Sequence, residues 1–97
     1  MDLYKAINDE EIDRWNDTER LPKGATFTSS HEDAVAFGME FITGRVYIAS
    51  IPFDPNLFEN IGRHDYYGLT HDVDLRAVID KLVINPLSPE LLHVIKR

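Results

Sequence analysis

The sequence predicts an α+β fold, in which residues 1–97 form a single domain with a small mixed or antiparallel sheet and three to four flanking helices. Two kinds of segment alternate along the chain: short runs rich in β-branched and aromatic residues, and stretches whose apolar residues recur at helical spacing. A length of 97 residues leaves room for one modest core and no second domain. Hydrophobic residues make up 43% and charged residues 28%, as in folded soluble proteins.

The absence of cysteine bears on the compartment. Small secreted domains usually depend on disulfides, so a chain with no cysteine is expected in a reducing, cytoplasmic setting. No long apolar run follows the first residues, and no stretch approaches the roughly 18 apolar residues of a membrane span. We therefore expect neither a standard export signal nor membrane association.

The first predicted elements are a strand and a surface helix. Residues 3–6 form a short apolar segment suited to a strand. Asn8 follows as a helix N-cap, and acids in the next turn suit the helix dipole, so we expect a helix as far as residues 15–17. Its apolar residues Ile12 and Trp15 lie three apart and share the inner face.

A second strand and helix follow. Residues 25–28 are a β-rich run, and Ser30 with Asp33 resembles a capping box at the start of a helix that Gly44 ends. We expect one buried face on this helix, formed by four residues at helical spacing: Ala34, Phe37, Gly38 and Phe41.

The second half of the chain is predicted to hold two more strands and two more helices around a long connection. In order, these segments are a central strand at residues 45–51, a connection at 52–72 with a helical turn at 56–60, a helix at 73–79, a strand at 81–85, and a closing helix from Ser88.

The charge is unevenly placed. Seventeen acids against ten bases give a formal charge of −7, and the first twenty residues hold seven of the acids. Such a field repels phosphate backbones, so we expect no direct nucleic-acid binding and favour a protein partner with a basic surface. The candidate partner-binding residues are Asp9, Glu10, Glu11 and Asp13. The alternative is a solvated helix face that only keeps the protein soluble.

Motifs that define most enzymes and metal sites are absent, and we expect no metal site. The pairs His64-Asp65 and His71-Asp72 have the right side chains for a divalent metal, but their spacing fits no standard metal motif. Tyr66 and Tyr67 beside them can stack on a ligand or fill a sheet surface.

Several separated segments follow one another in an informative order: residues 3–6, a Ser/Thr-containing segment at 24–30, a helix with Ala34 and Phe37, and the apolar strand residues 46–48. This order resembles that of the ADP-ribosyltransferases, of which the chain would be a short, degenerate member. In that family the first strand ends in a basic residue, the second carries a Ser/Thr-rich motif, and a later segment supplies a catalytic glutamate.

The resemblance implies an NAD-binding role for Lys5, Thr28, Ser29 and Ser30. Lysine at position 5 keeps the charge of the family's usual arginine but lacks the bidentate fork that suits phosphate. The residues also allow a simpler interpretation, in which Ser30 caps the second helix and the other hydroxyls stabilise a turn.

The resemblance also calls for a Glu/Gln-x-Glu motif, which the chain lacks. Asp72-Val73-Asp74 is the nearest equivalent, so Asp72 and Asp74 are the candidate catalytic residues, with Glu59 and Asp65 as further candidates. Aspartate is one methylene shorter, and a misplacement of about 1 Å can cost a hundredfold in rate.

Three functional hypotheses follow. The first is an ADP-ribosyltransferase-like domain that needs no cofactor and acts mainly by binding a protein; its size and charge resemble small phage or mobile-element inhibitors of bacterial defence. The alternative is an active NAD-dependent mono-ADP-ribosyltransferase. The third is a structural module with no pocket.

Overall fold

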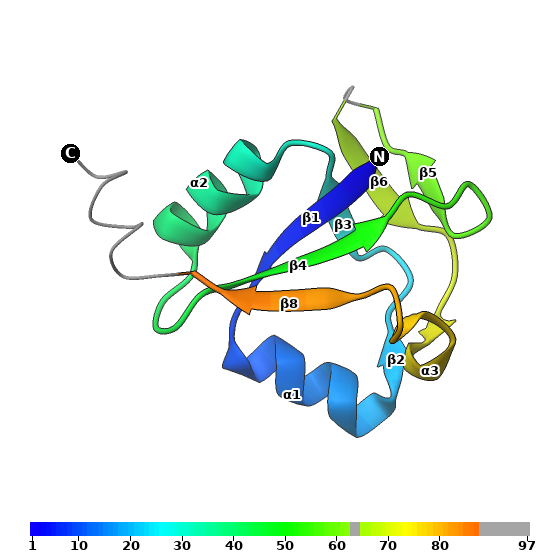
Figure 1. Cartoon of the computed structure of the whole chain (residues 1–97), viewed down its shortest axis with the longest axis horizontal. Helices are drawn as coiled ribbons and strands as arrows, with labels where there is room; N and C mark the ends of the chain where they lie inside the picture. The colour runs from blue at the N-terminus through cyan, green and yellow to red at the C-terminus, as the bar shows by residue number, and fades with distance from the viewer. Residues whose placement is uncertain (63–64, 88–97) are drawn as a thin grey trace.

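The protein is an α+β domain built on a six-stranded antiparallel sheet, seen in a computed structural model that describes residues 1–62 and 65–87 (Figure 1). The strand order is β5-β6-β3-β1-β4-β8, and every pairing is antiparallel. A separate two-stranded sheet joins β2 and β7. The elements are β1 (Asp2–Ile7), α1 (Asp9–Thr18), β2 (Arg20–Leu21), β3 (Thr26–Thr28), α2 (His31–Phe41), β4 (Tyr47–Pro52), β5 (Phe58–Asn60), β6 (Tyr66–Leu69), β7 (Val73–Asp74), α3 (Leu75–Val78) and β8 (Val83–Pro86).

The first strand and helix are confirmed. The Asn8 side chain accepts a hydrogen bond from the Glu11 backbone N–H at 3.0 Å, which makes it the expected N-cap of α1. Trp15 is 2% exposed, and Ile12 packs against the same buried cluster. The helix ends at Thr18, and its C-cap Glu19 has a φ of 55°, in the left-handed region.

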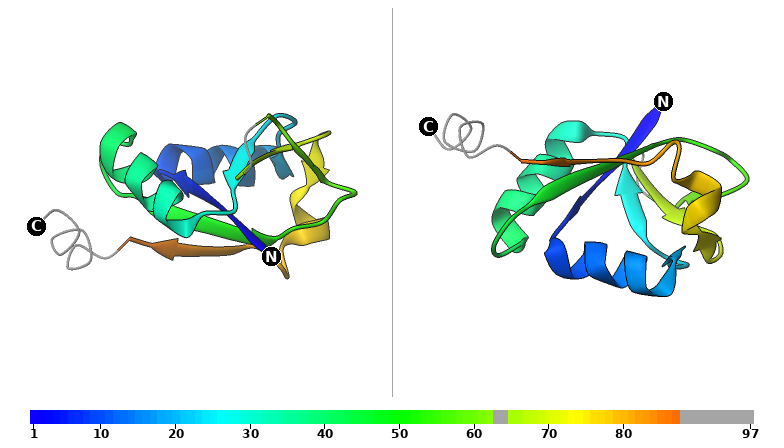
Figure 2. Two further views of the ribbon diagram at one scale, coloured as in Figure 1. Left: turned by 90° about the horizontal axis from the view of Figure 1, so that it is seen from above. Right: turned by 60° about the horizontal axis from the view of Figure 1, so that its bottom comes forward.

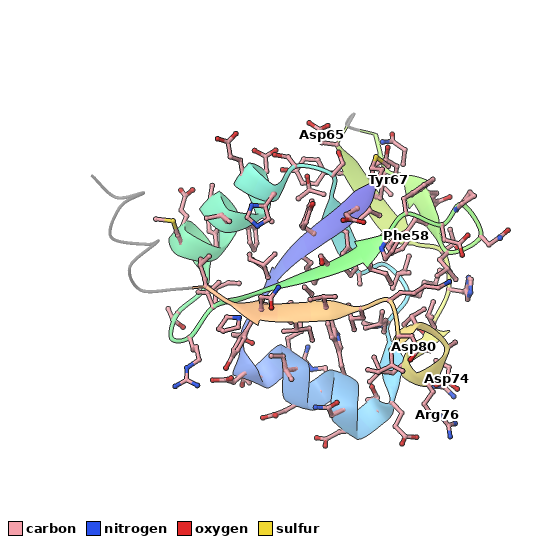
Figure 3. The ribbon with its side chains drawn as sticks, viewed as in Figure 1. Phe58, Asp65, Tyr67, Asp74, Arg76 and Asp80 are labelled. Atoms are coloured by element: carbon pink, nitrogen blue, oxygen red, sulfur yellow. The ribbon has the colours of Figure 1, made fainter. Side chains whose placement is uncertain are left out.

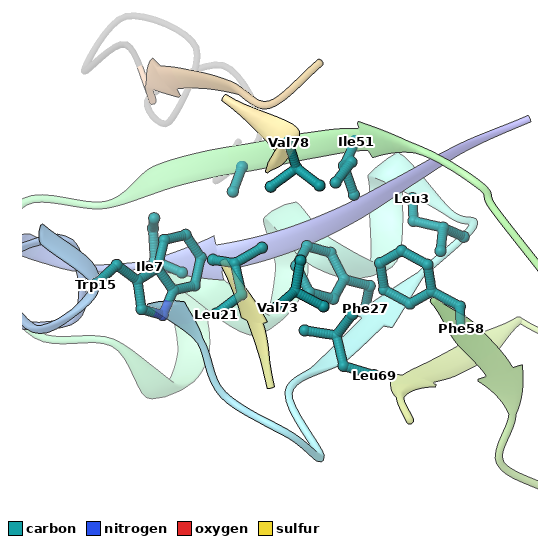
Figure 4. Close-up of a cluster of buried hydrophobic side chains, with 11 residues drawn as sticks. Leu3, Ile7, Trp15, Leu21, Phe27, Ile51, Phe58, Leu69, Val73 and Val78 are labelled. Carbon is teal, nitrogen blue, oxygen red and sulfur yellow. The ribbon is translucent and has the colours of Figure 1, made fainter. Parts of the chain in front are cut away.

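The two faces of the sheet bury different clusters. Successive side chains of β4 point to opposite faces of the sheet, so Ala49 and Ile51 lie in a larger cluster and Ile48 lies in a smaller one on the other face. The larger cluster lies on the face that α1 covers, and it forms one continuous layer of side chains from Trp15 to Phe58 (Figure 4). Its members are Leu3, Ile7, Trp15, Leu21, Phe27, Ala49, Ile51, Phe58, Leu69, Val73 and Val78.

The smaller cluster holds α2 against β1 and β4. Its members are Ala6, Ala34, Val35, Val46, Ile48 and Leu87. The strands of the sheet separate α1 from α2 in Figure 1 and in the right view of Figure 2. The expected central strand is therefore confirmed as β4, which lies between β1 and β8 and contributes to both clusters.

The buried face predicted for the second helix is partly wrong. Ala34 and Gly38 are buried as expected, but Phe37 is 52% and Phe41 64% exposed. The reason is the close approach of α2 to the sheet: a Cβ on Gly38 would lie 2.7 Å from Val46 Cγ1. Small residues face the sheet at that distance, and the two phenylalanines lie outside the contact.

The described residues of the segment 52–72 hold more regular structure than the predicted connection. They contain β5 and β6, which pair antiparallel, so residues 58–60 of the expected helical turn form a strand instead. A single turn lies just before that strand, where the backbone N–H groups of Leu57 and Phe58 both donate to the Asp54 carbonyl at 3.0 Å. Phe58 is buried with its ring centroid 5.3 Å from that of Phe27. Cross-strand pairing and this aromatic contact therefore determine the local structure, where composition alone indicated a loop.

The helix predicted at 73–79 is confirmed only in its second part. Residues 73–74 form β7, which pairs with β2. Helix α3 starts at Leu75 because the Asp74 side chain accepts a hydrogen bond from the Arg76 backbone N–H at 2.9 Å. The last predicted strand is β8, and the predicted closing helix lies outside the described residues. Among the helices of residues 1–62 and 65–87, none is both long enough and apolar enough to cross a membrane.

Candidate functional site

A pocket lies where strands β1 and β3 meet the N-terminal half of α2. The two strands are in register at a single pair, Tyr4 and Thr28, and the pocket opens beside that pair. Its volume is about 120 Å³. Its walls are mainly apolar and aromatic, with two charged residues among them, Lys5 and Asp33. We call it the β1–β3 pocket.

Lys5 contributes to this pocket while its charge is engaged elsewhere. Alternation along β1 places Lys5 on the same side as Leu3 and Ile7, which belong to the cluster that packs against α1. Its Nζ lies 3.5 Å from Glu11 Oε2 on that helix. The ammonium group therefore belongs to an ion pair with α1 and is not presented freely to the pocket.

The three hydroxyl residues predicted to bind NAD have structural partners. The Thr28 hydroxyl accepts from the Ser30 backbone N–H at 3.1 Å, and the Ser30 hydroxyl accepts from the Asp33 N–H at 3.1 Å. The Ser29 hydroxyl donates to Asp65 Oδ1 at 3.2 Å. Only Thr28 of the three lines the pocket. These bonds match the simpler interpretation, in which the hydroxyls stabilise a turn and cap α2.

The two candidate catalytic aspartates lie at a different place in the fold. Asp72 accepts from the Lys23 backbone N–H at 2.7 Å and lies 3.9 Å from an Arg20 nitrogen. Asp74 caps α3, and hydrogen bonds from the Arg76 backbone and side chain lower its pKa. Neither lines the β1–β3 pocket. Figure 3 shows Asp74 and Arg76 beside α3 at the lower right, well away from Asp65 at the top of the view.

The remaining acidic and metal-ligating candidates do not converge either. Glu59 is exposed on β5, and Asp65 is held by Ser29. The ring of His71 contacts the Thr70 hydroxyl at 2.9 Å, while His64 lies outside the described residues. Within residues 1–62 and 65–87, no three histidine or acidic side chains gather as a metal would require.

The acids predicted to bind a partner lie along α1. Asp9, Glu10 and Asp13 are exposed, and Glu11 is partly covered and paired with Lys5. The pKa of Arg45 is raised, first by a hydrogen bond with Tyr47 and further by the charge of Asp9. Glu10 and Asp13 have no ion pair within the part of the chain that the structure describes.

Sequence reasoning missed the pocket residues that come from other elements. Asp33 was identified only as a helix-capping residue, and Phe37 was assigned to the core. Tyr66 was identified as a possible stacking residue, and it does line the pocket, together with Tyr4. The missing information was the strand pairing, because residues 4, 28 and 66 meet only through the β1–β3–β6 register.

Comparison with known proteins gives no relative: no family model, curated protein or solved structure matches this chain.

Proposed function

We propose that this domain is a short ADP-ribosyltransferase-like scaffold that acts by binding a basic protein partner through the acidic outer face of α1. The observation that carries the proposal is an acidic surface that helix stability does not explain. Acids in the first turn of a helix suit its dipole, but Asp17 lies in the last turn and Glu19 is the C-cap, where the dipole favours bases. Asp13 lies in the middle of the helix, where the dipole favours neither charge. The last turn of α1 contains no basic residue.

The end of α1 supports the same proposal. Glu19 has a φ of 55°, a conformation that glycine or asparagine adopts with less strain. A charged residue that is locally unfavourable is a common feature of functional surfaces. In this position, Glu19 extends the acidic face past the end of the helix.

The separation of the candidate site residues favours binding over catalysis. Lys5 and Thr28 share a pocket, whereas Asp72 and Asp74 cap and brace the β2–β7 end of the molecule. Catalysis requires the acid within hydrogen-bond reach of the reacting atoms. A scaffold of this kind fits the role of a small protein inhibitor, such as those of phage and mobile elements.

Charge reversal tests the proposed surface. A partner captured from a lysate would be purified and titrated against the wild-type protein and against Glu10→Lys/Asp13→Lys at rising salt concentration. We expect the double variant to bind about tenfold more weakly and to lose most of the salt dependence, because two surface charge interactions are reversed. The matched control is Glu59→Lys/Asp80→Lys, which changes the net charge equally at exposed sites on other elements. Equal binding by both double variants would contradict the proposal.

The alternative, an NAD-dependent transferase, has one observation in its favour: Lys5 and Thr28 line the same pocket. Its volume of about 120 Å³ is below the roughly 300–1,000 Å³ of pockets that hold drug-sized ligands. Incubation with labelled NAD and lysate tests this alternative. Label transfer that is lost in Asp72→Ala/Asp74→Ala would establish it and overturn the binding-only function.

A further inference from the structure

We propose that the β1–β3 pocket is a binding site for an arginine side chain of the protein partner. Because the arginine is taken to belong to the basic partner proposed above, this inference rests on the proposed function. The affinity of the pocket for a guanidinium group is nevertheless measurable without that partner. Three features of the pocket carry the inference: its aromatic walls, its charge and its size.

The aromatic walls come from three different elements. Tyr4 on β1, Phe37 on α2 and Tyr66 on β6 line the pocket, whereas the ring of Phe27 on β3 packs in the larger cluster on the other face of the sheet. Aromatic ring faces attract a cation that lies within about 6 Å of the ring centroid. Arginine suits such walls better than lysine, because its planar guanidinium stacks on rings and is more weakly hydrated.

The charge at the opening is negative. Asp33 is exposed in the first turn of α2, and it has no ion pair among residues 1–62 and 65–87. Lys5 also lines the pocket, but its ammonium lies 3.5 Å from the Glu11 carboxylate on α1. An arginine that enters between the rings therefore meets an uncompensated carboxylate and a lysine that is already neutralised.

The size of the pocket limits the occupant to a single side chain. A volume of about 120 Å³ is less than half of the lower limit of the usual range for drug-sized ligands, roughly 300–1,000 Å³. A guanidinium group with its adjoining methylenes needs far less room than a dinucleotide.

The surface next to the pocket suits a protein segment. Phe37 is half-exposed, and its ring centroid lies 5.0 Å from that of the more exposed Phe41. Apolar contact area thus continues from the pocket along α2 for the residues that flank the arginine. A second copy of this chain is a poor occupant, because α2 carries Glu32, Asp33 and Glu40, and copies of this face would repel each other.

A titration of the 97-residue chain with N-acetyl-arginine methylamide, monitored by NMR of the backbone amides, tests the pocket. We expect saturable shifts centred on residues 4, 28, 33, 37 and 66, with a dissociation constant on the order of millimolar, as for one side chain. The citrulline derivative has nearly the same shape without the charge, and it should bind at least about fivefold more weakly.

Two substitutions and two matched controls separate the contributions. Asp33→Asn and Phe37→Leu should each weaken arginine binding about threefold to fivefold, because one removes the carboxylate and the other an aromatic face. Glu40→Gln and Phe41→Leu make the same chemical changes outside the pocket and should leave the constant unchanged.

Several results would overturn the inference. These are the absence of saturable shifts, equal binding of the citrulline derivative, or shifts confined to α1. Signals of the pocket residues that move with protein concentration alone would identify a second copy as the occupant. If NAD shifts these signals to saturation and arginine does not, the pocket is a dinucleotide site. If charge reversal on α1 does not weaken partner binding but arginine still saturates the pocket signals, the proposed function is overturned. The guanidinium site then remains supported.

Discussion

The two faces of the sheet differ in how completely they are covered. Among residues 1–62 and 65–87, the face toward α1 buries eleven residues in one continuous cluster, which includes the only tryptophan of the chain. The same described residues bury six on the face toward α2, four of which are alanine or valine. Beside α2 lie the β1–β3 pocket and two exposed phenylalanines. The hydrophobic stabilisation of the fold is therefore concentrated on the α1 face.

This difference shows where the domain can present a binding surface without losing its core. Side chains that contribute little to stability are free to serve recognition, and Phe37 and Phe41 on α2 are of this kind. On the opposite face, α1 can offer its outer surface to a partner, because its inner surface holds Trp15 and Ile12 against the larger cluster. That outer surface is the acidic one.

Removing one aromatic side chain from each helix tests this comparison most directly. Trp15→Ala should lower the free energy of unfolding by about 3–5 kcal/mol, because it empties a fully enclosed site in the larger cluster. Phe41→Ala should change it by less than about 0.5 kcal/mol, because the side chain is already mostly in water. Urea unfolding followed by far-UV circular dichroism measures both, since Trp15→Ala removes the only tryptophan.

A large loss in Phe41→Ala would show that α2 depends on this ring for its packing, and the two faces would then not differ as described. If Trp15→Ala does not fold, Trp15→Phe provides a smaller change at the same site. It should still be less stable than Phe41→Ala.

Local signals in the sequence were sufficient for much of this fold. The predicted N-caps Asn8 and Ser30 are present with their hydrogen bonds, because N-capping depends only on residues three positions apart. The predicted end of the second helix at Gly44 is wrong, since α2 ends at Phe41 with Ile42 as its C-cap. The alternation along β4 was also predictable from the residue pattern. Strands β5 and β6 were not, because Gly- and Pro-rich segments form strands only when a partner strand is in register.

The candidate site was less predictable than the fold. Lys5 and Thr28 were identified from motif order, and they do share a pocket. Asp33 and Phe37 were given other roles, because which side of α2 faces the sheet depends on the close approach at Gly38. That distance is a property of tertiary packing, and helical periodicity alone cannot supply it.

Substitution at Gly38 tests how closely α2 packs against the sheet. A methyl group there would lie 2.7 Å from Val46 Cγ1 and 3.1 Å from Ala6 Cβ, so α2 or the strands must shift. The steric overlap should cost about 1–3 kcal/mol, which exceeds the gain of up to about 1 kcal/mol from the higher helix propensity of alanine. We expect Gly38→Ala to lower the free energy of unfolding by about 1 kcal/mol in a urea titration.

The double variant Gly38→Ala/Val46→Ala isolates the cause. It removes the shorter of the two contacts, so the two substitutions should be coupled, with a combined loss smaller than the sum of the single losses. Simple additivity would show that the contact with Val46 does not set the position of α2.

The smallest expected difference between the two faces is at the helix caps. Asn8→Ala and Ser30→Ala each remove one side-chain acceptor for a backbone N–H, from α1 and α2 respectively. Each should lower the free energy of unfolding by about 1 kcal/mol, and the amides of Glu11 and Asp33 should exchange faster with solvent. If both substitutions lower the free energy of unfolding equally, the two faces differ in side-chain packing and not in their helix caps. A loss at Ser30 well above that at Asn8 would instead mean that α2, with its thin buried cluster, depends on its cap to stay folded against the sheet.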